Sequence, residues 1–358
     1  MITQLQVQGF KSLRDVRLKL GRFNLFVGPN ASGKSNLFDA LRFLQGVGYG
    51  FTVDEILNGK PKTANSEVWE AIRGGSTKLE FVPQEAGKGV MVGAAFSQPA
   101  FSYSLRVAPE TGHVLGERFK RGALTIYEGE GNHPGYTGFT IRYYHGKRGQ
   151  PPKELLEKHR PGLLQLPKKP WCQPKHSEYA LECARVLSDS QRLDPSPAVL
   201  REYAAPRALR MGERGENFAA VVDAILHNDG TRTAYPAWLK KLTPQEMGEI
   251  RILHGALGEP LFALRRDGVD FPAPVLSDGT LRFAAIAAAF FQPDMPGRLL
   301  IEEIENGIHA DRLRLLMELL RTQAGQQNVQ VFATTHSPVA LSWLTKEDFP
   351  TTFFCRKD

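Results

Sequence analysis

The sequence predicts an α/β protein with a mainly parallel core sheet. Short apolar runs, typical of buried strands, occur at 24–27, 299–301 and 329–333. Segments with the apolar spacing of helices occur at 35–44, 281–291 and 311–321. Strands that alternate with helices favour a parallel sheet covered on both faces. Ligands of such sheets bind beyond the carboxyl ends of the strands.

The amino-terminal third predicts a second, antiparallel sheet. Residues 2–8 alternate apolar and polar side chains. Further strand patterns, joined by Gly and Pro turns, follow at 78–82, 90–96, 101–107 and 123–127. Residues 128–175 are rich in Gly, Pro and basic side chains, so we expect long loops there. Helical patterns return over 178–257.

We therefore expect three parts in the chain. An amino-terminal lobe with the antiparallel β subdomain spans 1–127, a basic loop and helical insertion spans 128–260, and a carboxyl-terminal lobe spans 261–358. The longest apolar run, 283–291, is too short to cross a bilayer, and the amino terminus lacks a signal-peptide pattern. The three cysteines match no zinc or disulfide spacing. We expect unpaired thiols, a cytoplasmic location and no membrane contact.

Positive charge is concentrated in one region. The chain has a net charge of +7, and residues 118–175 hold twelve Lys and Arg side chains against four acids. Aromatic side chains are interleaved with them: Tyr127, Tyr136, Tyr143, Tyr144 and Trp171. Such a region can follow a nucleic-acid backbone, or it can be an ordinary solvated face. Charge alone leaves both interpretations open.

Residues 28–35 (GPNASGKS) fit the phosphate-loop pattern G-x-x-x-x-G-K-[ST] without a mismatch. Glycines let backbone N–H groups surround phosphate oxygens, and the helix that follows presents its positive end to them. Lys34 would neutralise phosphate charge, and the Ser35 hydroxyl would bind Mg²⁺. The predicted ATP-binding residues are Gly28, Asn30, Ala31, Ser32, Gly33, Lys34, Ser35 and Asn36.

Two acids follow the predicted strand 299–301 at the edge where ligands bind. Glu302 would help to hold Mg²⁺ together with Ser35, and Glu303 would polarise the attacking water. Ser277 opens the helix at 281–291 as a capping residue, which on chemistry alone is its simplest role. His336 follows the strand 329–333 and is a candidate donor to a γ-phosphate oxygen.

The order of these motifs resembles the ABC-type ATPases of the RecF, SMC and OLD-like group. The phosphate loop at 28–36, the signature-like segment at 276–282 (LSDGTLR), the Walker B and D-loop segment at 299–309 (LLIEEIENGIH) and the switch-histidine segment at 334–338 (TTHSP) all occur in the family order. Residues 10–12 (FKS) resemble the motif that opens such chains, and 212–218 (GERGENF) resembles a segment of small bacterial ATPases in this group.

The resemblance implies roles that the motifs alone do not. Two ATP molecules would lie between two copies of the chain, and Ser277, Asp278 and Gly279 of one copy would contact the γ-phosphate held by the other. Glu303 would be the catalytic base, Glu302 the Mg²⁺-associated acid and His336 the switch histidine. Glu305 and Asn306 would lie in the D-loop at the dimer interface.

The chain also departs from the family patterns. Asp278 and Thr280 replace the Gly and Gln of transporter signatures, which argues against a transporter. Ile304 and Ala310 stand where Pro is common. We expect no TOPRIM nuclease domain after His336, because only about twenty residues remain, and the ending suggests a missing tail.

Three functions fit these patterns. The first is an ATP-hydrolysing homodimer that switches a separate effector, a nuclease or toxin, in bacterial anti-phage defence. The second is a RecF-like DNA-binding ATPase that grips phosphates through residues 118–175. The third is an ATP-binding sensor with little turnover. Family analogy, and not site chemistry, favours the first.

Overall fold

The computed structural model describes residues 1–61, 69–80, 89–130, 138–146, 150–242 and 248–356. The chain divides into two compact units. Unit 1 comprises residues 1–21, 30–190 and the carboxyl-terminal end from Cys355, and unit 2 comprises residues 22–29 and 191–354. The phosphate-loop segment therefore begins in unit 2, at Gly28, and continues in unit 1 from Asn30.

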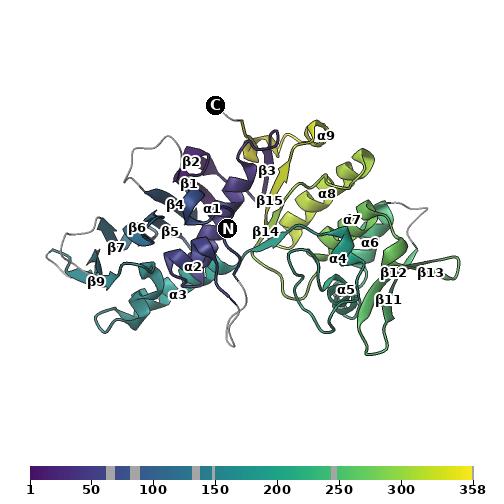
Figure 1. Ribbon diagram of the computed structural model, residues 1–358, viewed down its shortest axis with the longest axis horizontal. Coiled ribbons are helices and arrows are strands. Elements are labelled where there is room, and N and C mark those ends of the chain that lie inside the picture. The colour runs from purple at the N-terminus through teal and green to yellow at the C-terminus, as the bar shows by residue number, and fades with distance from the viewer. Residues whose placement is uncertain (62–68, 81–88, 131–137, 147–149, 243–247, 357–358) are drawn as a thin grey trace. The chain divides into compact units, whose positions relative to one another are not determined.

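Unit 1 contains an antiparallel sheet of eight strands among its described residues (Figure 1). In spatial order they are β2 (Leu13–Lys19), β1 (Ile2–Phe10), β4 (Val90–Phe96), β5 (Phe101–Ala108), β6 (His113–Arg121), β7 (Leu124–Glu130), β8 (Gly138–Tyr143) and β9 (Lys153–Glu157). Buried and half-buried positions alternate along β5, with Tyr103 and Leu105 buried. One face of the sheet is therefore a core face, as expected for antiparallel strands.

Helices pack on the core face of this sheet. They are α1 (Lys34–Gly48), α2 (Val53–Asn58) and α3 (Pro174–Ser188), with short 3-10 turns at 76–78, 162–164 and 166–168. α1 contacts β1, where the rings of Phe10 and Phe43 meet edge to face at 6.4 Å. α1 also crosses α3 closely: a Cβ atom on Gly48 would lie 2.5 Å from the carbonyl oxygen of Ala184. Only glycine fits this crossing.

A buried carboxylate fastens the 162–164 turn to the sheet. Glu117, on β6, is 3% exposed and accepts hydrogen bonds from the hydroxyls of Tyr103 and Tyr127, both at 2.7 Å. It also accepts from the backbone N–H groups of Gly162 (2.7 Å) and Leu163 (3.2 Å). Burial raises the pKa of Glu117 above its usual value, although these four donors act in the opposite direction.

Unit 2 is built on a parallel five-stranded sheet, again among the described residues (Figure 1). Its order is β10 (Gln191–Leu193), β14 (Arg298–Ile301), β15 (Gln330–Thr335), β3 (Phe23–Val27) and β16 (Thr352–Phe354). β3, β14 and β15 are buried at every position, as central strands of a parallel sheet are. In register, Val27 pairs with Thr335, and Ile301 pairs with Ala333.

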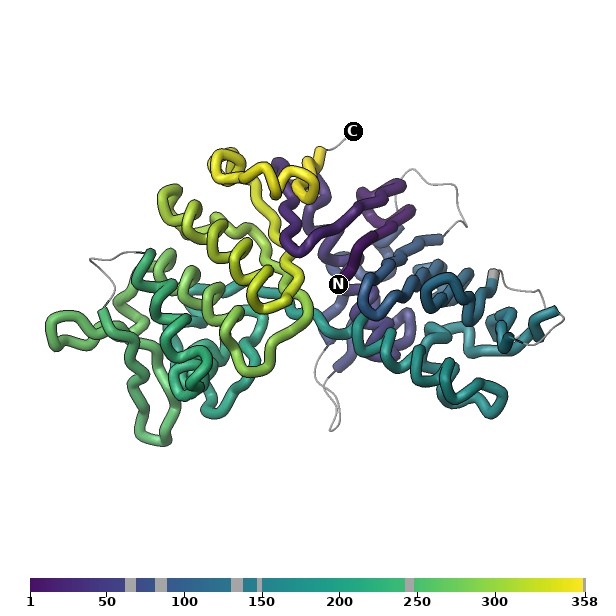
Figure 2. The backbone as a smooth tube through the Cα atoms, turned by 180° about the vertical axis from the view of Figure 1, so that it is seen from behind, coloured from purple at the N-terminus to yellow at the C-terminus, as the bar shows by residue number. Residues whose placement is uncertain are grey.

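A separate three-stranded antiparallel sheet and several helices complete unit 2. The strands are β11 (Glu249–His254), β12 (Pro260–Arg266) and β13 (Val269–Pro272). The helices are α4 (Pro197–Leu200), α5 (Phe218–Leu226), α6 (Ala234–Leu242), α7 (Asp278–Ala288), α8 (Ala310–Gln326) and α9 (Pro338–Leu341), with 3-10 turns at 273–275 and 349–351. α7 is apolar nearly all round and lies in the core of the unit, between α5 and α6. Figure 2 shows the same helices from behind, with α8 beside α6.

The structure confirms the parallel sheet and the amino-terminal antiparallel sheet. The predicted helices at 35–44, 281–291 and 311–321 correspond to α1, α7 and α8. Among the described residues, no helix has both the length and the apolar content needed to cross a bilayer.

Three predictions on secondary structure were wrong. The expected loops at 128–175 contain β8, β9 and the start of α3, so the antiparallel sheet continues to Glu157. Residues 249–254, expected to be helical, form β11. In β8 the buried Ile141 and Tyr143 flank the exposed Arg142, and charges on the outer face obscured this alternation. The strand predicted at 78–82 is a 3-10 turn through Lys78, and residues 81 and 82 lie outside the described residues.

We predict that Glu117→Ala lowers the free energy of unfolding by about 2–4 kcal/mol, because it leaves four buried donors without their acceptor. Urea unfolding followed by tryptophan fluorescence measures the change. The exposed Glu110→Ala is the matched control and should change stability by less than about 0.5 kcal/mol. Equal changes in the free energy of unfolding for the two variants would show that the hydrogen bonds of Glu117 do not stabilise the fold.

Candidate functional site

Three predicted motifs meet at one edge of the parallel sheet in unit 2. Gly28 follows β3, Glu302 and Glu303 follow β14, and His336 follows β15, the strand between them. The Gly28 N–H donates to the carbonyl of Thr335 at 3.2 Å, which continues the ladder past the end of β3. The start of the phosphate loop, the two acids and the histidine thus come from three adjacent strand ends.

Glu303 has a left-handed backbone conformation, with φ at +48°. This conformation is uncommon for a residue with a side chain and persists where neighbouring groups hold it. The Glu303 N–H donates to the Thr334 hydroxyl at 2.9 Å, and the Ile304 N–H donates to the Thr334 carbonyl at 3.1 Å. Thr334 lies on β15, between β14 and β3 in the sheet, and therefore fixes the turn that carries both acids.

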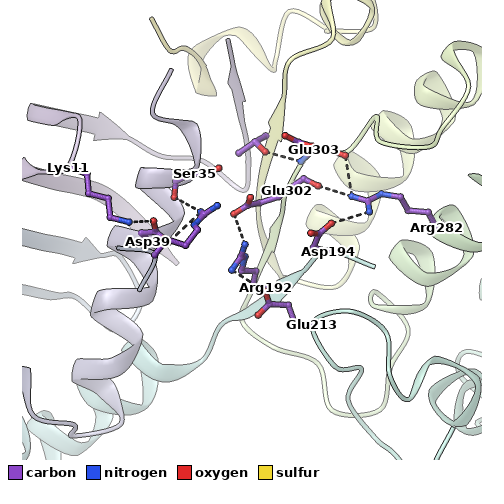
Figure 3. Close-up of polar contacts among 11 residues, drawn as sticks. Lys11, Ser35, Asp39, Arg192, Asp194, Glu213, Arg282, Glu302 and Glu303 are labelled. Carbon is purple, nitrogen blue, oxygen red and sulfur yellow. Dashed lines mark hydrogen bonds and ion pairs between the residues drawn. The ribbon is translucent and has the colours of Figure 1, made fainter. Parts of the chain in front are cut away.

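Arg282 holds the same turn from the other side. Its guanidinium is 3% exposed and donates to the backbone carbonyls of Glu302 (2.9 Å), Glu303 (3.2 Å) and Pro195 (2.8 Å). It also pairs with the carboxylate of Asp194 at 3.1 Å (Figure 3). Because Arg282 lies on α7, one side chain connects the signature helix to the backbone of the two acids.

The Glu302 side chain points to a different arginine. Its Oε1 atom lies 3.1 Å from Nη2 of Arg192, on the edge strand β10. Nη1 of Arg192 lies 3.0 Å from Glu213, so one guanidinium bridges two carboxylates (Figure 3).

The part of the phosphate loop that lies in unit 1 has the backbone geometry of a tight loop. Ala31 and Gly33 have positive φ, +62° and +95°. A Cβ atom on Gly33 would lie 2.5 Å from Oγ of Ser12, and Ser12 also accepts a hydrogen bond from the Asn36 amide at 2.8 Å. The loop ends where α1 begins, at Lys34, which is 6% exposed.

The first turn of α1 is suited to an anion. It contains no acidic residue, and the N–H groups at a helix start have no acceptors within the helix. Lys11 pairs with Asp39 on the next turn at 2.5 Å, and Arg73 donates to the Ser35 carbonyl at 3.2 Å (Figure 3). Burial lowers the pKa of Lys11, although Asp39 acts in the opposite direction. The FKS motif thus braces the loop and helix α1, a role that its sequence did not indicate.

The signature-like segment caps α7. The Ser277 hydroxyl accepts from the Thr280 N–H at 3.2 Å, as predicted for a helix cap. Asp278 is exposed and pairs with Arg201 at 2.5 Å. A Cβ atom on Gly279 would lie 2.6 Å from the carbonyl oxygen of Gly307, so glycine lets the signature helix approach the D-loop closely.

The D-loop in turn holds the histidine. Glu305 accepts from the backbone N–H groups of His336 (2.6 Å) and Ser337 (3.2 Å), and its carboxylate lies 2.8 Å from Nδ1 of His336. The Asn306 N–H donates to the carbonyl of Glu303 at 2.8 Å. Glu305 therefore orients the imidazole, and Asn306 closes the turn after the acids.

Sequence reasoning missed two residues of this site. Arg282 carried a usable signal, because it is a single charge at the start of an apolar helix and such a charge needs partners when it is buried. Arg192 carried none, since nothing local relates a short strand at 191–193 to the acids at 302–303. The pairing of β10 with β14 brings them together.

The basic region has a regular arrangement on the outer face of the sheet in unit 1. Arg118, Glu128, Arg142 and Lys153 lie directly opposite one another across β6, β7, β8 and β9. They border a hollow of about 240 Å³. Tyr127 and Tyr143 are buried in the core, so these two aromatic side chains do not lie on the surface beside the cations. Tyr136, Lys147 and Arg148 lie outside the described residues.

The predicted Mg²⁺ ligands fit the chemistry of that ion. The Ser35 hydroxyl and the Glu302 carboxylate are both oxygen donors, which Mg²⁺ prefers. No group of three or more His, Cys, Asp or Glu side chains able to hold a metal occurs in the part of the chain that the structure describes. This suits an ion that takes one or two protein oxygens and completes its shell with phosphate and water.

Known proteins match the same parts of the chain. A family model described as an AAA domain, putative AbiEii toxin, Type IV TA system, matches residues 186–342, and one described as an AAA ATPase domain matches residues 1–72. An OLD nuclease of Thermus scotoductus is 22% identical over 366 aligned positions, which cover 95% of this chain and 59% of that protein. The chain thus spans about three fifths of that relative's length.

Two SMC proteins are also similar. The chromosome partition protein Smc of Desulfitobacterium hafniense is 49% identical over 47 residues, which cover 13% of this chain and 4% of that protein. A solved SMC head bound to the C-winged helix domain of ScpA is 15% identical with a TM-score of 0.49, over 95% of this chain and 91% of that chain.

The parallel sheet, the glycine-rich loop after its strand β3 and the acids after β14 define a P-loop nucleotide-binding protein. The order of the four motifs and the two family matches specify the group further. Together with the similarity to an OLD nuclease, they support an ABC-type P-loop ATPase of the SMC and OLD-like group.

We predict that Arg282→Met lowers the free energy of unfolding by about 3 kcal/mol, because three buried carbonyls lose their shared donor. Thermal unfolding of the full chain measures the loss. The exposed Arg314→Met, on α8, is the control and should leave the melting temperature within about one degree. A variant at 282 that melts with the parent would refute the structural role given to this arginine.

Proposed function

We propose that this chain is a cytoplasmic ATPase that binds ATP with Mg²⁺, hydrolyses it in a homodimer and thereby switches a separate effector. The observation that carries the proposal is the convergence of Gly28, Glu302, Glu303 and His336 at adjacent strand ends of one parallel sheet. This is the edge at which such sheets bind ligands.

In the proposed complex, residues 28–35 surround the phosphates. The backbone N–H groups of the loop and the first turn of α1 donate to phosphate oxygens, and Lys34 neutralises their charge. The positive φ values of Ala31 and Gly33 support this role, because they turn the backbone as phosphate nests require. Asn30, Ser32 and Asn36 complete the set of proposed ATP contacts.

For hydrolysis, Glu303 accepts a hydrogen bond from a water molecule and takes its proton as the water oxygen attacks the γ-phosphorus. The bond between the γ-phosphorus and the bridging oxygen breaks, and ADP and phosphate leave. Mg²⁺, held by Ser35 and Glu302, would offset the charge of the phosphate oxygens. His336, oriented by Glu305 through its Nδ1 atom, donates from Nε2 to a γ-phosphate oxygen.

The proposed dimer uses the signature segment in trans. Ser277, Asp278 and Gly279 of one copy contact the γ-phosphate bound by the other, and Glu305 and Asn306 lie at the seam. Support comes from the exposure of Asp278 and from the start of α7 at this point, because the first N–H groups of a helix lack acceptors within it. The contacts of Arg282 and Gly279 give the segment a rigid link to the acids of its own copy.

The effector in this proposal is a separate nuclease or toxin of an anti-phage system. The similarity to an OLD nuclease and to a family described as a putative AbiEii toxin supports this choice. An alternative within the same site is a sensor that binds ATP and turns it over slowly. The next experiment separates these two behaviours.

We predict that Glu303→Gln binds ATP like the parent but hydrolyses it at least about 100-fold more slowly, since it removes the general base. The variant should accumulate as an ATP-bound dimer. Phosphate release measures turnover, and light scattering after size-exclusion chromatography measures the dimer. A parent protein that binds ATP and releases no phosphate would favour the sensor.

Two further variants serve as controls for that experiment. Lys34→Ala should abolish ATP binding, because a phosphate charge loses its partner. Ser277→Arg, in the Glu303→Gln background, should bind ATP and remain monomeric, because a large side chain blocks the seam. A Ser277→Arg protein that still dimerises with ATP would contradict the contact in trans.

A second candidate function is binding of a DNA backbone by unit 1. The cations Arg118, Arg142 and Lys153 support it, although Arg118 pairs with Glu128 at 2.8 Å. Their row continues through Ser104, Gly93 and Gln6 to Arg17 on β2. With strands about 4.8 Å apart, these cations extend over roughly 34 Å. Small and polar side chains between them leave the face open to a phosphate chain.

We predict that the triple variant Arg118→Glu, Arg142→Glu, Lys153→Glu weakens DNA binding and flattens its salt dependence. The slope of log affinity against log salt should fall by about 0.9 for each lost phosphate contact. Fluorescence anisotropy of a labelled duplex over a salt series measures this. The control reverses three exposed charges in unit 2: Arg232, Lys240 and Lys346. Equal slopes for both triple variants would exclude this face.

A further inference from the structure

Arg192 lies between two carboxylates and forms one contact with each. Its Nη2 atom is 3.1 Å from Glu302, and its Nη1 atom is 3.0 Å from Glu213 (Figure 3). Neither contact is bidentate, the geometry that makes arginine–carboxylate pairs strong. The Nε atom of Arg192 is buried and has no partner among the described residues. The guanidinium is therefore shared and is not locked onto either acid.

The two acids differ in their surroundings. The Glu302 side chain is 11% exposed, whereas that of Glu213 is 34% exposed. A carboxylate with little access to water needs a cation nearby to remain charged at low cost. Pairing with Arg192 therefore offsets a larger cost of burial at Glu302 than at Glu213.

The GERGENF motif accounts for the position of Glu213. Its turn is held internally, because the Gly212 N–H donates to the Asn217 side chain at 2.7 Å and Gly215 has φ at +88°. It is also joined to the chain that leaves β10, where the Asp194 N–H donates to the Glu213 carbonyl at 2.8 Å. A rigid turn thus keeps Glu213 next to Arg192.

Strand pairing keeps Arg192 next to Glu302. Arg192 lies opposite Leu300 in the parallel pair of β10 and β14, two residues before Glu302. The three groups, one cation between two anions, therefore form a built cluster within unit 2. The Mg²⁺-binding acid of the proposed function is one of its members.

We propose that Arg192 is a positioning residue that neutralises Glu302 in the absence of Mg²⁺, and that Glu213 draws Arg192 away when Mg²⁺ binds. The inference rests on the proposed function of Glu302. A guanidinium on Glu302 and a divalent cation near the same oxygens repel each other, so the two compete. Glu213 lowers the energy of the displaced arginine by keeping it paired. The GERGENF motif thereby sets the affinity for Mg²⁺.

Competition between Arg192 and the metal ion predicts opposite changes in metal affinity when Arg192 and Glu213 are substituted. Arg192→Gln removes the competing charge and should tighten binding of a divalent ion by about fivefold, the scale of one partly exposed ion pair. Glu213→Ala leaves Arg192 wholly on Glu302 and should weaken binding by about fivefold. A purely structural role would weaken binding in both variants.

The measurement is Mn²⁺ affinity of the full-length protein with a non-hydrolysable ATP analogue. Electron paramagnetic resonance reports free Mn²⁺, and protein in excess over the analogue ensures that all nucleotide is bound. Arg192→Lys keeps the charge and should stay within about twofold of the parent. Arg251→Ala, on the edge strand β11, is the matched control and should not change the affinity.

A double variant, Arg192→Gln with Glu213→Ala, tests whether Glu213 acts through Arg192 or directly on the metal ion through its own charge. If Glu213 acts through Arg192, Glu213→Ala has no effect in the Arg192→Gln background. A fivefold weakening that persists there overturns the proposal, as does an Arg192→Gln protein that binds Mn²⁺ no more tightly than the parent. A parent that does not bind the analogue refutes the proposed function itself. A parent that binds it, with all variants unchanged, refutes only the role of Arg192.

Discussion

The parallel pairing of β3, β15 and β14 is the constraint on which the rest of unit 2 depends. Pairing of Val27 with Thr335 and of Ile301 with Ala333 aligns three strand ends at one edge. A shift of one residue would turn every side chain to the opposite face. Because these strands are buried at all positions, packing on both faces fixes the register. The positions of Gly28, Glu302 and His336 follow from it.

Beyond the strand ends, hydrogen bonds from buried polar side chains, and no longer the sheet, hold the loops of the site in place. Arg282, Thr334 and Glu305 bind backbone groups of the acidic turn and the histidine segment. Each connects two motifs that are far apart in sequence. This arrangement explains how Glu303 keeps a left-handed backbone, because its N–H and its carbonyl both have fixed partners. Hydrogen bonds therefore join each motif to the next.

Charge is organised differently in the two units. In unit 2 the cations near the acids are paired, Arg282 being buried and Arg192 partly buried, and Arg282 holds the backbone of the acidic turn. In unit 1 the cations of β6, β8 and β9 lie on an exposed face above a core of buried Tyr and Phe side chains. Alternation along antiparallel strands produces this separation, since successive side chains point to opposite faces. Because of the same alternation, the side chains of Tyr127 and Tyr143 point into the core.

The sequence by itself determined the buried strands, the phosphate loop, the acids that follow 299–301 and the order of the motifs. These are local patterns, and burial of apolar residues makes local patterns visible. Only the tertiary structure decided that β8 and β9 extend the antiparallel sheet, that FKS braces α1, and that Arg192, Glu213 and Arg282 surround the acids. These contacts join residues up to 110 positions apart, such as Arg192 and Glu302, and depend on which strands pair. No local pattern specifies that choice.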